Sequence, residues 1–533
     1  MARGPPRGCG VTKYVGPATV ALLALTALAL IASGEAQTLQ WARTFGTAGN
    51  DVASDVAVDS SGSVYAAGGL FGGQATDSVF LRKYSDNGAE LWTRQIATDY
   101  GDAGISVGSD ISNNIYLVGY AGVQDIFVRK YDEAGNELWT VEFGSSGSQI
   151  SDVYVSPQGD TYIAGNTFGS LPGNTYFGGF GDGYAAKVSS SGSLAWVRQV
   201  GTSGTDSAKA VGADAVGNAY VAGQYGNEPF VAKVDLAGNL SWLGQFGSSA
   251  LDNAEAVAVG PSGVFVAGWT EGALPGQTSL GGEDAFIRKY SASGDEEWTR
   301  QFGTAQVDSA KLLSVDSTGF VYVGGQTTGT LGGQSAGGVY IRKYSDSGAP
   351  VWTQQVGGGG VDDIYDLALS SASEVFLFGI TDGALPGQTS AGGYDMFLVE
   401  MDQTGSLGFT TQFGSSGSDT PKQIALDSGA VYVSGGVQGP LLGEPYHGGD
   451  GDGFIAKFGP IATPTPTPTP TAMPTPTPAA VGGIVQIRTN ADASPAEGGP
   501  SDARTLPVAA GSVAVGLLLL GAGGLYVVRM RRG

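Results

Sequence analysis

The sequence predicts an all-β protein, an eight-bladed β-propeller whose blades each contain four antiparallel strands. Three observations lead to this prediction: an aromatic residue recurs at intervals of 46 to 57 residues, each interval holds four short alternating runs, and 90 of the 533 residues are glycine. Periods near 50 residues are typical of propellers, and turns between strands favour glycine. The recurring aromatic residues are Trp41, Trp92, Trp139, Trp196, Trp242, Trp298, Trp352 and Phe409.

One repeat illustrates the four runs, which are 252–259 (DNAEAVAV), 263–268 (GVFVAG), 284–290 (DAFIRKY) and 297–302 (EWTRQF). Each run has the length of a strand and is bounded by turn residues. The second run occurs eight times along the chain, from VYAAG to VYVSG, and so does the third. No helical period lies between the runs, so the repeats read as propeller blades.

The fourth run follows only seven of the eight third runs. The missing copy stands at the start of the chain, where 39–45 (LQWARTF) has no partner runs before it. We expect this segment to pair with 453–458, the last third run, and to complete the last blade. Such closure removes the free edges that an open array of strands would expose.

The units VAVDSSGSVYAAG…DSVFLRKYSDNGAELW and LLSVDSTGFVYVGGQTTG…IRKYSDSGAPVW resemble SBBP-type β-propeller repeats, over residues 40–459. The resemblance implies a secreted or surface-displayed propeller, often without assigned chemistry and usually with seven blades, whereas the count here is eight. Units such as KYSDNGAELW also resemble the repeats of eight-bladed quinone-cofactor dehydrogenases. That second resemblance implies cofactor-docking and metal residues that we cannot place in this sequence.

The first 36 residues have the pattern of a secretory signal peptide. Arg3, Arg7 and Lys13 precede an uncharged apolar run, 18–32, and small residues then lead to Ala36, near which we expect cleavage. The alternative is an uncleaved anchor. The propeller is then expected over residues 37–459.

The C-terminal part predicts a tethered protein. Residues 460–505 are a Thr/Pro-rich stalk and polar spacer, 506–528 form an apolar segment long enough for a transmembrane helix, and 529–533 are a basic tail. The positive-inside rule places the tail in the cytoplasm and the propeller outside. The LPVAAG stretch resembles a sortase-type sorting signal but lacks its Thr-Gly, so attachment to a cell wall stays a minor alternative.

Composition excludes several classes of function. A net charge of −23 disfavours binding to nucleic acid or to anionic lipid surfaces. The chain has one histidine, His447, and one cysteine, Cys9, which rules out an internal disulfide and a Cys/His zinc site. We expect no enzyme activity and no cofactor, with calcium as an open alternative.

Some residues recur in nearly every repeat. An acid stands just before seven of the first runs, where it acts either as a turn cap or as part of a cation-binding ring. The turn cap is favoured, because like charges about 10 Å apart repel by roughly 1–2 kcal/mol at an effective dielectric near 20. The acids are Asp51, Asp102, Asp206, Asp252, Asp308, Asp362 and Asp419, with Gln149 as the exception.

The third run carries a recurring lysine, with Glu400 as the exception. Pairing of each lysine with the acid of its own blade is a weak hypothesis, because Gln149 and Glu400 fall in different blades. The recurring tryptophans are expected to pack between neighbouring blades. The lysines are Lys83, Lys130, Lys187, Lys233, Lys289, Lys343 and Lys457.

We expect the residues that determine ligand specificity to lie in the segments that differ between repeats. The segment between the second and third runs is long in blades 3, 5, 6, 7 and 8, and strand alternation places these loops on the face where the recurring acids lie. Exposed aromatic rings there suit sugar or peptide recognition, although they could instead pack their own loops. The candidate ligand-binding residues are Tyr176, Phe177, Trp269, Tyr394, Tyr446 and His447. Asp450 and Asp452 are weak calcium candidates, because Asp452 also begins a third run.

The predicted function is that of a surface binding or adhesion module whose ligand is a glycan or a protein. Two alternatives stay open, a propeller enzyme of the quinoprotein or carbohydrate-active kind and a purely structural surface-layer component. No pair of carboxylates stands out as a glycosidase would require.

Overall fold

The computed structural model describes residues 37–72, 78–97, 104–121, 125–145, 147–226, 228–332, 337–357, 359–427, 429–460 and 526–527. These residues form eight antiparallel sheets, with no helix among them, and four consecutive strands of the ring make up each blade. The predicted eight-bladed propeller is confirmed.

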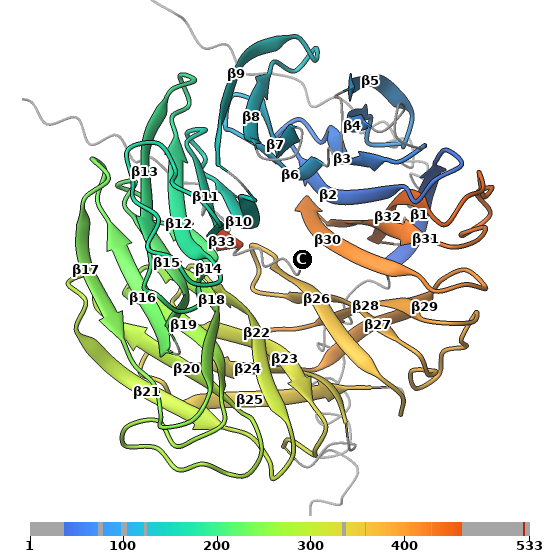
Figure 1. Cartoon of the computed structure of the whole chain (residues 1–533). Helices are drawn as coiled ribbons and strands as arrows, with labels where there is room; N and C mark the ends of the chain where they lie inside the picture. The colour runs from blue at the N-terminus through green and yellow to red at the C-terminus, as the bar shows by residue number, and fades with distance from the viewer. Residues whose placement is uncertain are drawn as a thin grey trace, which may run out of the picture. The chain divides into compact units, whose positions relative to one another are not determined.

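In each blade the first strand lies nearest the centre of the ring and the fourth lies outermost (Figure 1). The innermost strands are β2 (Val52–Val58), β6 (Gly104–Ser109), β10 (Gln149–Val155), β14 (Asp206–Ala213), β18 (Asp252–Gly260), β22 (Asp308–Val315), β26 (Asp362–Leu369) and β30 (Thr420–Asp427). The second strands are β3 (Val64–Leu70), β7 (Ile115–Ala121), β11 (Thr161–Thr167), β15 (Ala219–Tyr225), β19 (Gly263–Thr270), β23 (Val321–Thr327), β27 (Val375–Thr381) and β31 (Ala430–Val437).

The third strands are β4 (Ser78–Tyr84), β8 (Asp125–Tyr131), β12 (Asp182–Val188), β16 (Glu228–Val234), β20 (Asp284–Tyr290), β24 (Gly338–Tyr344), β28 (Asp395–Met401) and β32 (Asp452–Pro460). The outermost strands are β5 (Glu90–Ala97), β9 (Glu137–Gly144), β13 (Leu194–Val200), β17 (Leu240–Gln245), β21 (Glu296–Phe302), β25 (Pro350–Val356), β29 (Leu407–Phe413) and β1 (Gln37–Phe45).

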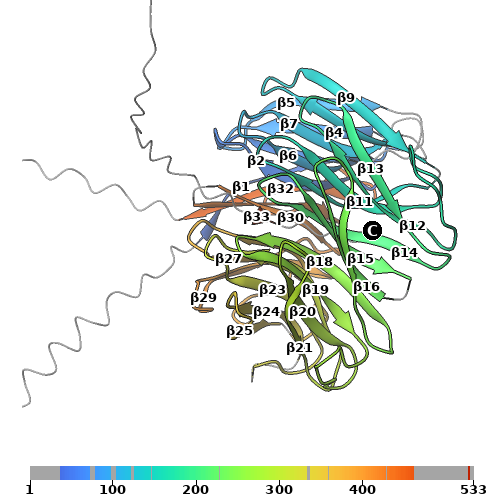
Figure 2. The same cartoon turned by 90° about the vertical axis from the view of Figure 1, so that its left-hand side faces the viewer.

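The N-terminal strand closes the ring. β1 pairs antiparallel with β32, with Trp41 opposite Lys457 and Phe45 opposite Gly453, so the expected pairing of 39–45 with 453–458 is confirmed. Figures 1 and 2 both show β1 beside β32, at the junction of the last blade with the first. Every blade therefore has four strands, although the eighth is assembled from both ends of the propeller.

A close backbone approach explains why the second run always ends in glycine. The inner strand of blade 5 has a bulge between Ala254 and Ala256, opposite Gly268. A Cβ atom on Gly268 would lie 1.9 Å from the carbonyl oxygen of Asn253. Gly165 and Gly325 meet carbonyl oxygens at the same 1.9 Å in their own blades. Only glycine fits where the bulge brings the two backbones together.

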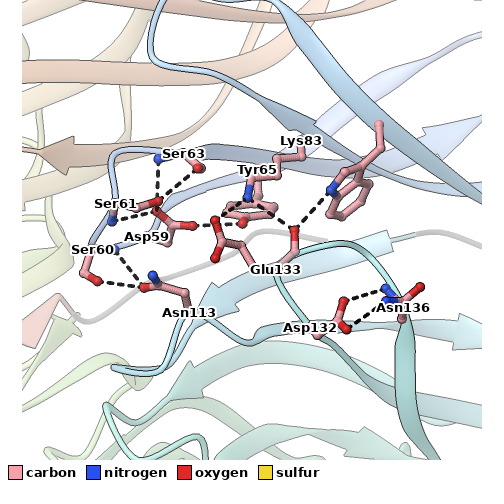
Figure 3. A network of polar contacts seen from close by, with 11 residues as sticks. Asp59, Ser60, Ser61, Ser63, Tyr65, Lys83, Asn113, Asp132, Glu133 and Asn136 are labelled. Atoms are coloured by element: carbon pink, nitrogen blue, oxygen red, sulfur yellow. Dashed lines mark hydrogen bonds and ion pairs between the residues drawn. The ribbon is translucent and has the colours of Figure 1, made fainter.

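The recurring tryptophan and lysine hold each blade to the next. In blade 1, Lys83 Nζ and Trp92 Nε1 both donate to the carbonyl oxygen of Glu133, which lies in the turn between the third and outer strands of blade 2; each distance is 3.2 Å. Lys83 also forms an ion pair with the Glu133 carboxylate and lies over the ring of Tyr65 (Figure 3). This arrangement of one lysine and one tryptophan on a turn of the next blade is called the clamp below.

The clamp is repeated around the ring. The lysine and the tryptophan share one carbonyl oxygen in five junctions, at Asp86, Glu133, Ser190, Ala292 and Gln403. The hypothesis that each lysine pairs with the acid of its own blade is therefore wrong, because these lysines reach a turn of the following blade, at the other end of the strands. The expected packing of the tryptophans between blades is confirmed.

The predicted leader (1–36), most of the stalk and spacer (460–505) and the tail (529–533) lie outside the described residues. In the segment 506–528, only Tyr526 and Val527 are described, and they form a two-residue strand, β33, paired with Ser314 and Val315 at the inner edge of β22. Across the described ranges we find no helix of the length and apolar character needed to cross a membrane.

Candidate binding face

The long loops and the recurring acids lie at the same end of the strands. The backbone N–H of Asp308 donates to the carbonyl oxygen of Glu283 at 2.8 Å, and the N–H of Asp419 donates to Tyr394 at 2.9 Å. Each of these bonds joins a loop that ends at a third strand to the start of the next inner strand. We call this end of the propeller the loop face.

The recurring acids hold the turns that lead into the inner strands. Asp206 is 1% exposed and accepts the backbone N–H groups of Thr202 and Gly226 at 2.7 and 2.6 Å. Asp252 and Asp419 accept the N–H of the residue four positions earlier, each at 2.6 Å. Burial raises the pKa of Asp419. This is the geometry of turn caps, with each carboxylate turned toward its own turn. Asp102 lies outside the described residues.

Long loops of the loop face are pinned by a glutamine from the outer strand. In blade 5, Gln301 Oε1 accepts the N–H of Leu274 at 2.9 Å, while Nε2 donates to the carbonyl oxygen of Gly272 at 2.7 Å and to Asp284 Oδ2 at 2.8 Å. Gln199 and Gln412 make the same three contacts in blades 3 and 7. The loops are therefore fixed to their blades, as a preformed recognition surface requires. The sequence analysis did not identify these glutamines.

His447 takes the place of this glutamine in blade 8. Asp452 Oδ2 accepts the backbone N–H of His447 at 2.6 Å and lies 3.0 Å from its Nδ1. The outer strand of this blade comes from the start of the chain and carries Thr44 at the corresponding position, which instead donates to the carbonyl oxygen of Pro445 at 2.6 Å. His447 thus makes the side-chain contact with Asp452 that Thr44 of β1 does not make. The His447 side chain is 38% exposed.

The predicted aromatic residues occupy four different blades and do not line one pocket. The hydroxyl groups of Tyr176 and Tyr446 donate to carbonyl oxygens of their own loops, Gly179 at 3.1 Å and Gly449 at 2.8 Å. Trp269 is half-buried in β19, with Nε1 3.4 Å from Glu255 Oε1. Tyr394 is half-buried. The two tyrosines that hydrogen-bond within their own loops have limited freedom to contact a ligand.

Three phenylalanines of one loop are exposed instead. Phe168, Phe177 and Phe180 belong to residues 168–181 of blade 3 and are 45%, 52% and 82% exposed. The N–H of Phe177 donates to Asp182 Oδ2 at 2.8 Å, and the N–H of Phe180 donates to Gly204 at 3.2 Å, so the backbone between the rings is held. Of the three, the sequence analysis named only Phe177. The available signal for Phe180 was the stretch TYFGGF, which places three aromatic residues in a short glycine-containing loop.

Asp450 and Asp452, the weak calcium candidates, lie in different environments. Asp452 is buried and begins β32, whereas Asp450 is exposed and its N–H donates to the carbonyl oxygen of Gly49 at 3.1 Å. Over the residues that the structure describes, we find no group of three or more His, Cys, Asp or Glu side chains placed to share a metal ion.

Two hollows lie away from these residues. A cavity of about 210 Å³ between the inner strands of blades 1, 2, 3, 7 and 8 is lined mainly by small apolar side chains such as Ala57, Val153 and Ala425. A more open hollow of about 520 Å³ lies at the closing junction, beside Asp86 and Lys457. The ion pair between these two residues occupies its wall, so the hollow is part of a clamp.

Comparison with known proteins agrees with this architecture. The family model described as SBBP, a β-propeller repeat, matches residues 195–227 and 297–333. The regulatory protein FlaEY of Caulobacter vibrioides is 26% identical over 205 residues, which are 33% of this chain and 22% of that protein. The chain thus matches less than a quarter of the length of this relative.

Two solved structures show limited similarity to this chain at low sequence identity. The Dos1 propeller is 10% identical with a TM-score of 0.44, covering 79% of this chain and 96% of that chain. Sqt1 from Chaetomium thermophilum is 12% identical with a TM-score of 0.46, covering 78% and 98%. The closed ring shows that this chain is an eight-bladed β-propeller, and two of its segments match the SBBP β-propeller repeat.

Proposed function

We propose that the protein is a membrane-tethered binding module that displays the propeller outside the cell and recognises a surface protein through the loop face. The exposed phenylalanines of residues 168–181 carry this proposal. A phenylalanine that is 82% exposed, as Phe180 is, contributes little to folding through burial in the free protein and becomes buried only when a partner covers it. Aromatic anchors of this kind dominate the affinity of protein interfaces.

Rigidity of the loop supports recognition rather than disorder. Gln199 fixes the loop at Leu171, Gly169 and Asp182, and the hydroxyl of Tyr176 closes its far end. A partner that binds a preformed loop loses little conformational entropy, which favours affinity. The predicted signal peptide, stalk and membrane segment support display at the cell surface.

A peptide-display selection against the propeller tests the proposal. A random peptide library is selected on the wild-type protein, with removal of peptides that also bind the double variant F177A/F180A. Peptides that bind the wild type at least tenfold more tightly than the double variant are expected. The variant Leu407→Ala, which removes a side chain of similar exposure at the start of β29, away from the loop face, serves as the control and should bind these peptides normally.

Two outcomes would contradict a protein ligand. If no peptide distinguishes the wild type from F177A/F180A, the loop is not a peptide-binding surface. If an array of immobilised glycans instead retains the wild type and loses the double variant, the ligand is a glycan that stacks on the same rings.

A further inference from the structure

Three successive blades expose an aliphatic side chain at the same position of the loop face. Leu251, Val307 and Val361 each stand one residue before the recurring acid that begins the inner strand of blades 5, 6 and 7. They are 52%, 48% and 57% exposed. Because β22 contacts both β18 and β26, the three residues follow one another around the inner edge of the loop face (Figure 1). We call these three residues the apolar rim.

Packing between blades does not require an apolar residue at this position. A residue needed for that packing would be apolar in every repeat, as the buried positions of the inner strands are. Single exposed aliphatic residues are common on proteins, but three at one position of neighbouring blades indicate a surface that a partner covers. The described residues at this position in the blades outside the arc are polar, namely Asn50, Ser148, Thr205 and Ser418.

The backbone of the apolar rim is held in the same way in each blade. The carbonyl oxygens of the three rim residues accept the N–H groups of Glu271, Thr328 and Asp382, at 2.8, 2.9 and 3.2 Å. Each of these donors is the residue that directly follows the second strand of its blade. In blade 7, Asp382 Oδ1 also accepts the N–H of Val361 at 2.6 Å. A partner therefore meets a rim that is already ordered, which favours affinity.

Acidic side chains surround the apolar rim. Glu271 and Asp382, whose N–H groups bond to the rim, are both exposed. Glu283, at the end of the long loop of blade 5, is half-buried, and its pKa is raised by burial and by the negative charge of Glu271. Lys311 of β22 opposes this shift but forms an ion pair with Asp363. The rim thus combines exposed aliphatic groups with an excess of negative charge.

We propose that the apolar rim binds a cationic segment of the partner protein, in which lysine or arginine side chains stand next to aliphatic ones. The aliphatic side chains of this segment cover the rim, and its cations lie beside Glu271 and Asp382. Burial supplies affinity, while the opposite charges supply orientation and faster association. The proposal rests on the proposed function, because it names the chemistry of a partner at the loop face, but its residues belong to blades 5–7 and not to blade 3.

Binding of short fluorescent peptides to the full chain tests this chemistry. The probe KLKLKLK carries both features, whereas KSKSKSK lacks aliphatic side chains and ELELELE carries the opposite charge. We expect KLKLKLK to bind at least about tenfold more tightly than either comparison peptide. Its affinity should fall as the salt concentration rises, because salt screens the attraction between exposed charges.

Substitution of the rim locates the bound probe. In the test variant, serine replaces each of the three rim residues, and KLKLKLK should bind about tenfold more weakly than to the wild type. The matched control L91S/L138S/V351S removes three aliphatic side chains that are 55%, 50% and 50% exposed near the start of outer strands, at the other end of the blades. This control should bind the probe normally. Urea midpoints close to that of the wild type verify that both variants are folded.

A second pair of variants changes charge alone. E271Q/D382N should weaken the binding of KLKLKLK severalfold and reduce its dependence on salt. E90Q/E137Q removes the same number of exposed acids at the first residues of β5 and β9, and should leave the affinity unchanged. The comparison separates attraction at the rim from the overall negative charge of the protein.

The proposal is overturned if KLKLKLK does not bind, if the rim variant and its control lose the same affinity, or if E271Q/D382N binds the probe like the wild type. None of these results touches the proposed function, because peptides selected against F177A/F180A report on blade 3. If instead no selected peptide distinguishes F177A/F180A, the proposed function fails while the defined probe still reports on the rim.

Discussion

Trp41 donates its indole N–H to the carbonyl oxygen of Asp86 at 2.8 Å, and Lys457 reaches the same residue. Trp41 lies in β1, Lys457 lies in β32 and Asp86 lies in blade 1. The closing junction therefore uses the same clamp as the junctions inside the chain. The hydrogen bonds at this junction are of the same kind as those between blades that follow one another in the sequence.

Substitution of Trp41 by phenylalanine should destabilise the protein more than the same substitution of Trp196. Both rings are 8% exposed, but the Nε1 of Trp196 has no hydrogen-bond partner among the described residues. Trp41→Phe loses a bond worth about 1 kcal/mol, whereas Trp196→Phe removes a buried donor whose unmet desolvation costs about 1–3 kcal/mol. Midpoints of urea unfolding compare the two variants. Equal losses of unfolding free energy in the two variants would show that the hydrogen bond of Trp41 adds nothing to the packing of its indole.

Alanine at Gly268 should be among the most destabilising single changes in the chain. Its Cβ would lie 1.9 Å from the carbonyl oxygen of Asn253, so the bulge must move, and we expect a loss of at least about 3 kcal/mol. Gly276 is the matched control. Its φ is +73° but nothing lies within 4 Å of an added Cβ, so Gly276→Ala should cost only the roughly 1–2 kcal/mol of a left-handed alanine. Thermal unfolding measures both, and similar losses would mean that the bulge yields easily.

Gln301→Ala should loosen the long loop of blade 5 and leave the strands intact. The substitution frees the N–H of Leu274 and one acceptor of Asp284, at about 1–3 kcal/mol for each buried group left unpaired. Hydrogen exchange over residues 271–283 should accelerate, while β20 stays protected. Gln306→Ala provides the control, because Gln306 is an exposed glutamine on the same face whose side chain makes no such contacts. Unchanged exchange in Q301A would mean that the turn residues alone hold the loop.

Stability of the protein should fall as the pH rises from about 5 to 8. Burial raises the pKa of Glu400 to about 7, with the charge of Glu374 as the second cause. Because the folded protein holds this proton more tightly than the unfolded chain, the stabilisation is complete below the ordinary glutamate pKa and is lost as the pH passes 7. The shift corresponds to about 3 kcal/mol.

Urea unfolding at several pH values measures this slope. E400Q should abolish it, because glutamine does not titrate in this range. A slope that persists in E400Q would assign it to another group.

Periodicity was enough to predict the fold, because each strand carries its own alternation and each turn its own glycine. Only seven of the eight third runs are followed by a fourth run, so the unpartnered segment 39–45 was predicted to close the ring. Contacts between repeats were harder to predict. Lys83 was compared with the acid of its own blade, yet its partner Glu133 lies 50 residues further along the chain, in a turn whose backbone oxygen carries no sequence signal.

The candidate site was predicted only in outline. The sequence correctly predicted which blades carry long loops and that these loops lie at the end of the strands where the recurring acids stand. Insertions between strands are visible when the repeats are aligned with one another. Side-chain roles were not visible. Tyr176, Tyr446 and His447 all make contacts within their own loops, and Gln199 was overlooked because a glutamine near the end of an outer strand looks like any exposed polar residue. Exposure, which distinguishes Phe180 from the other aromatic residues, is a property of three-dimensional packing.

The pairing of β32 with both β31 and β1 has a mechanical consequence. Any tension carried by the chain beyond Pro460 enters the ring through a strand that is hydrogen-bonded along both sides, so it cannot peel a sheet from its edge one bond at a time. A pull along this strand must shear two ladders together. The pairing that closes the ring therefore also makes β32 resistant to a force along the strand.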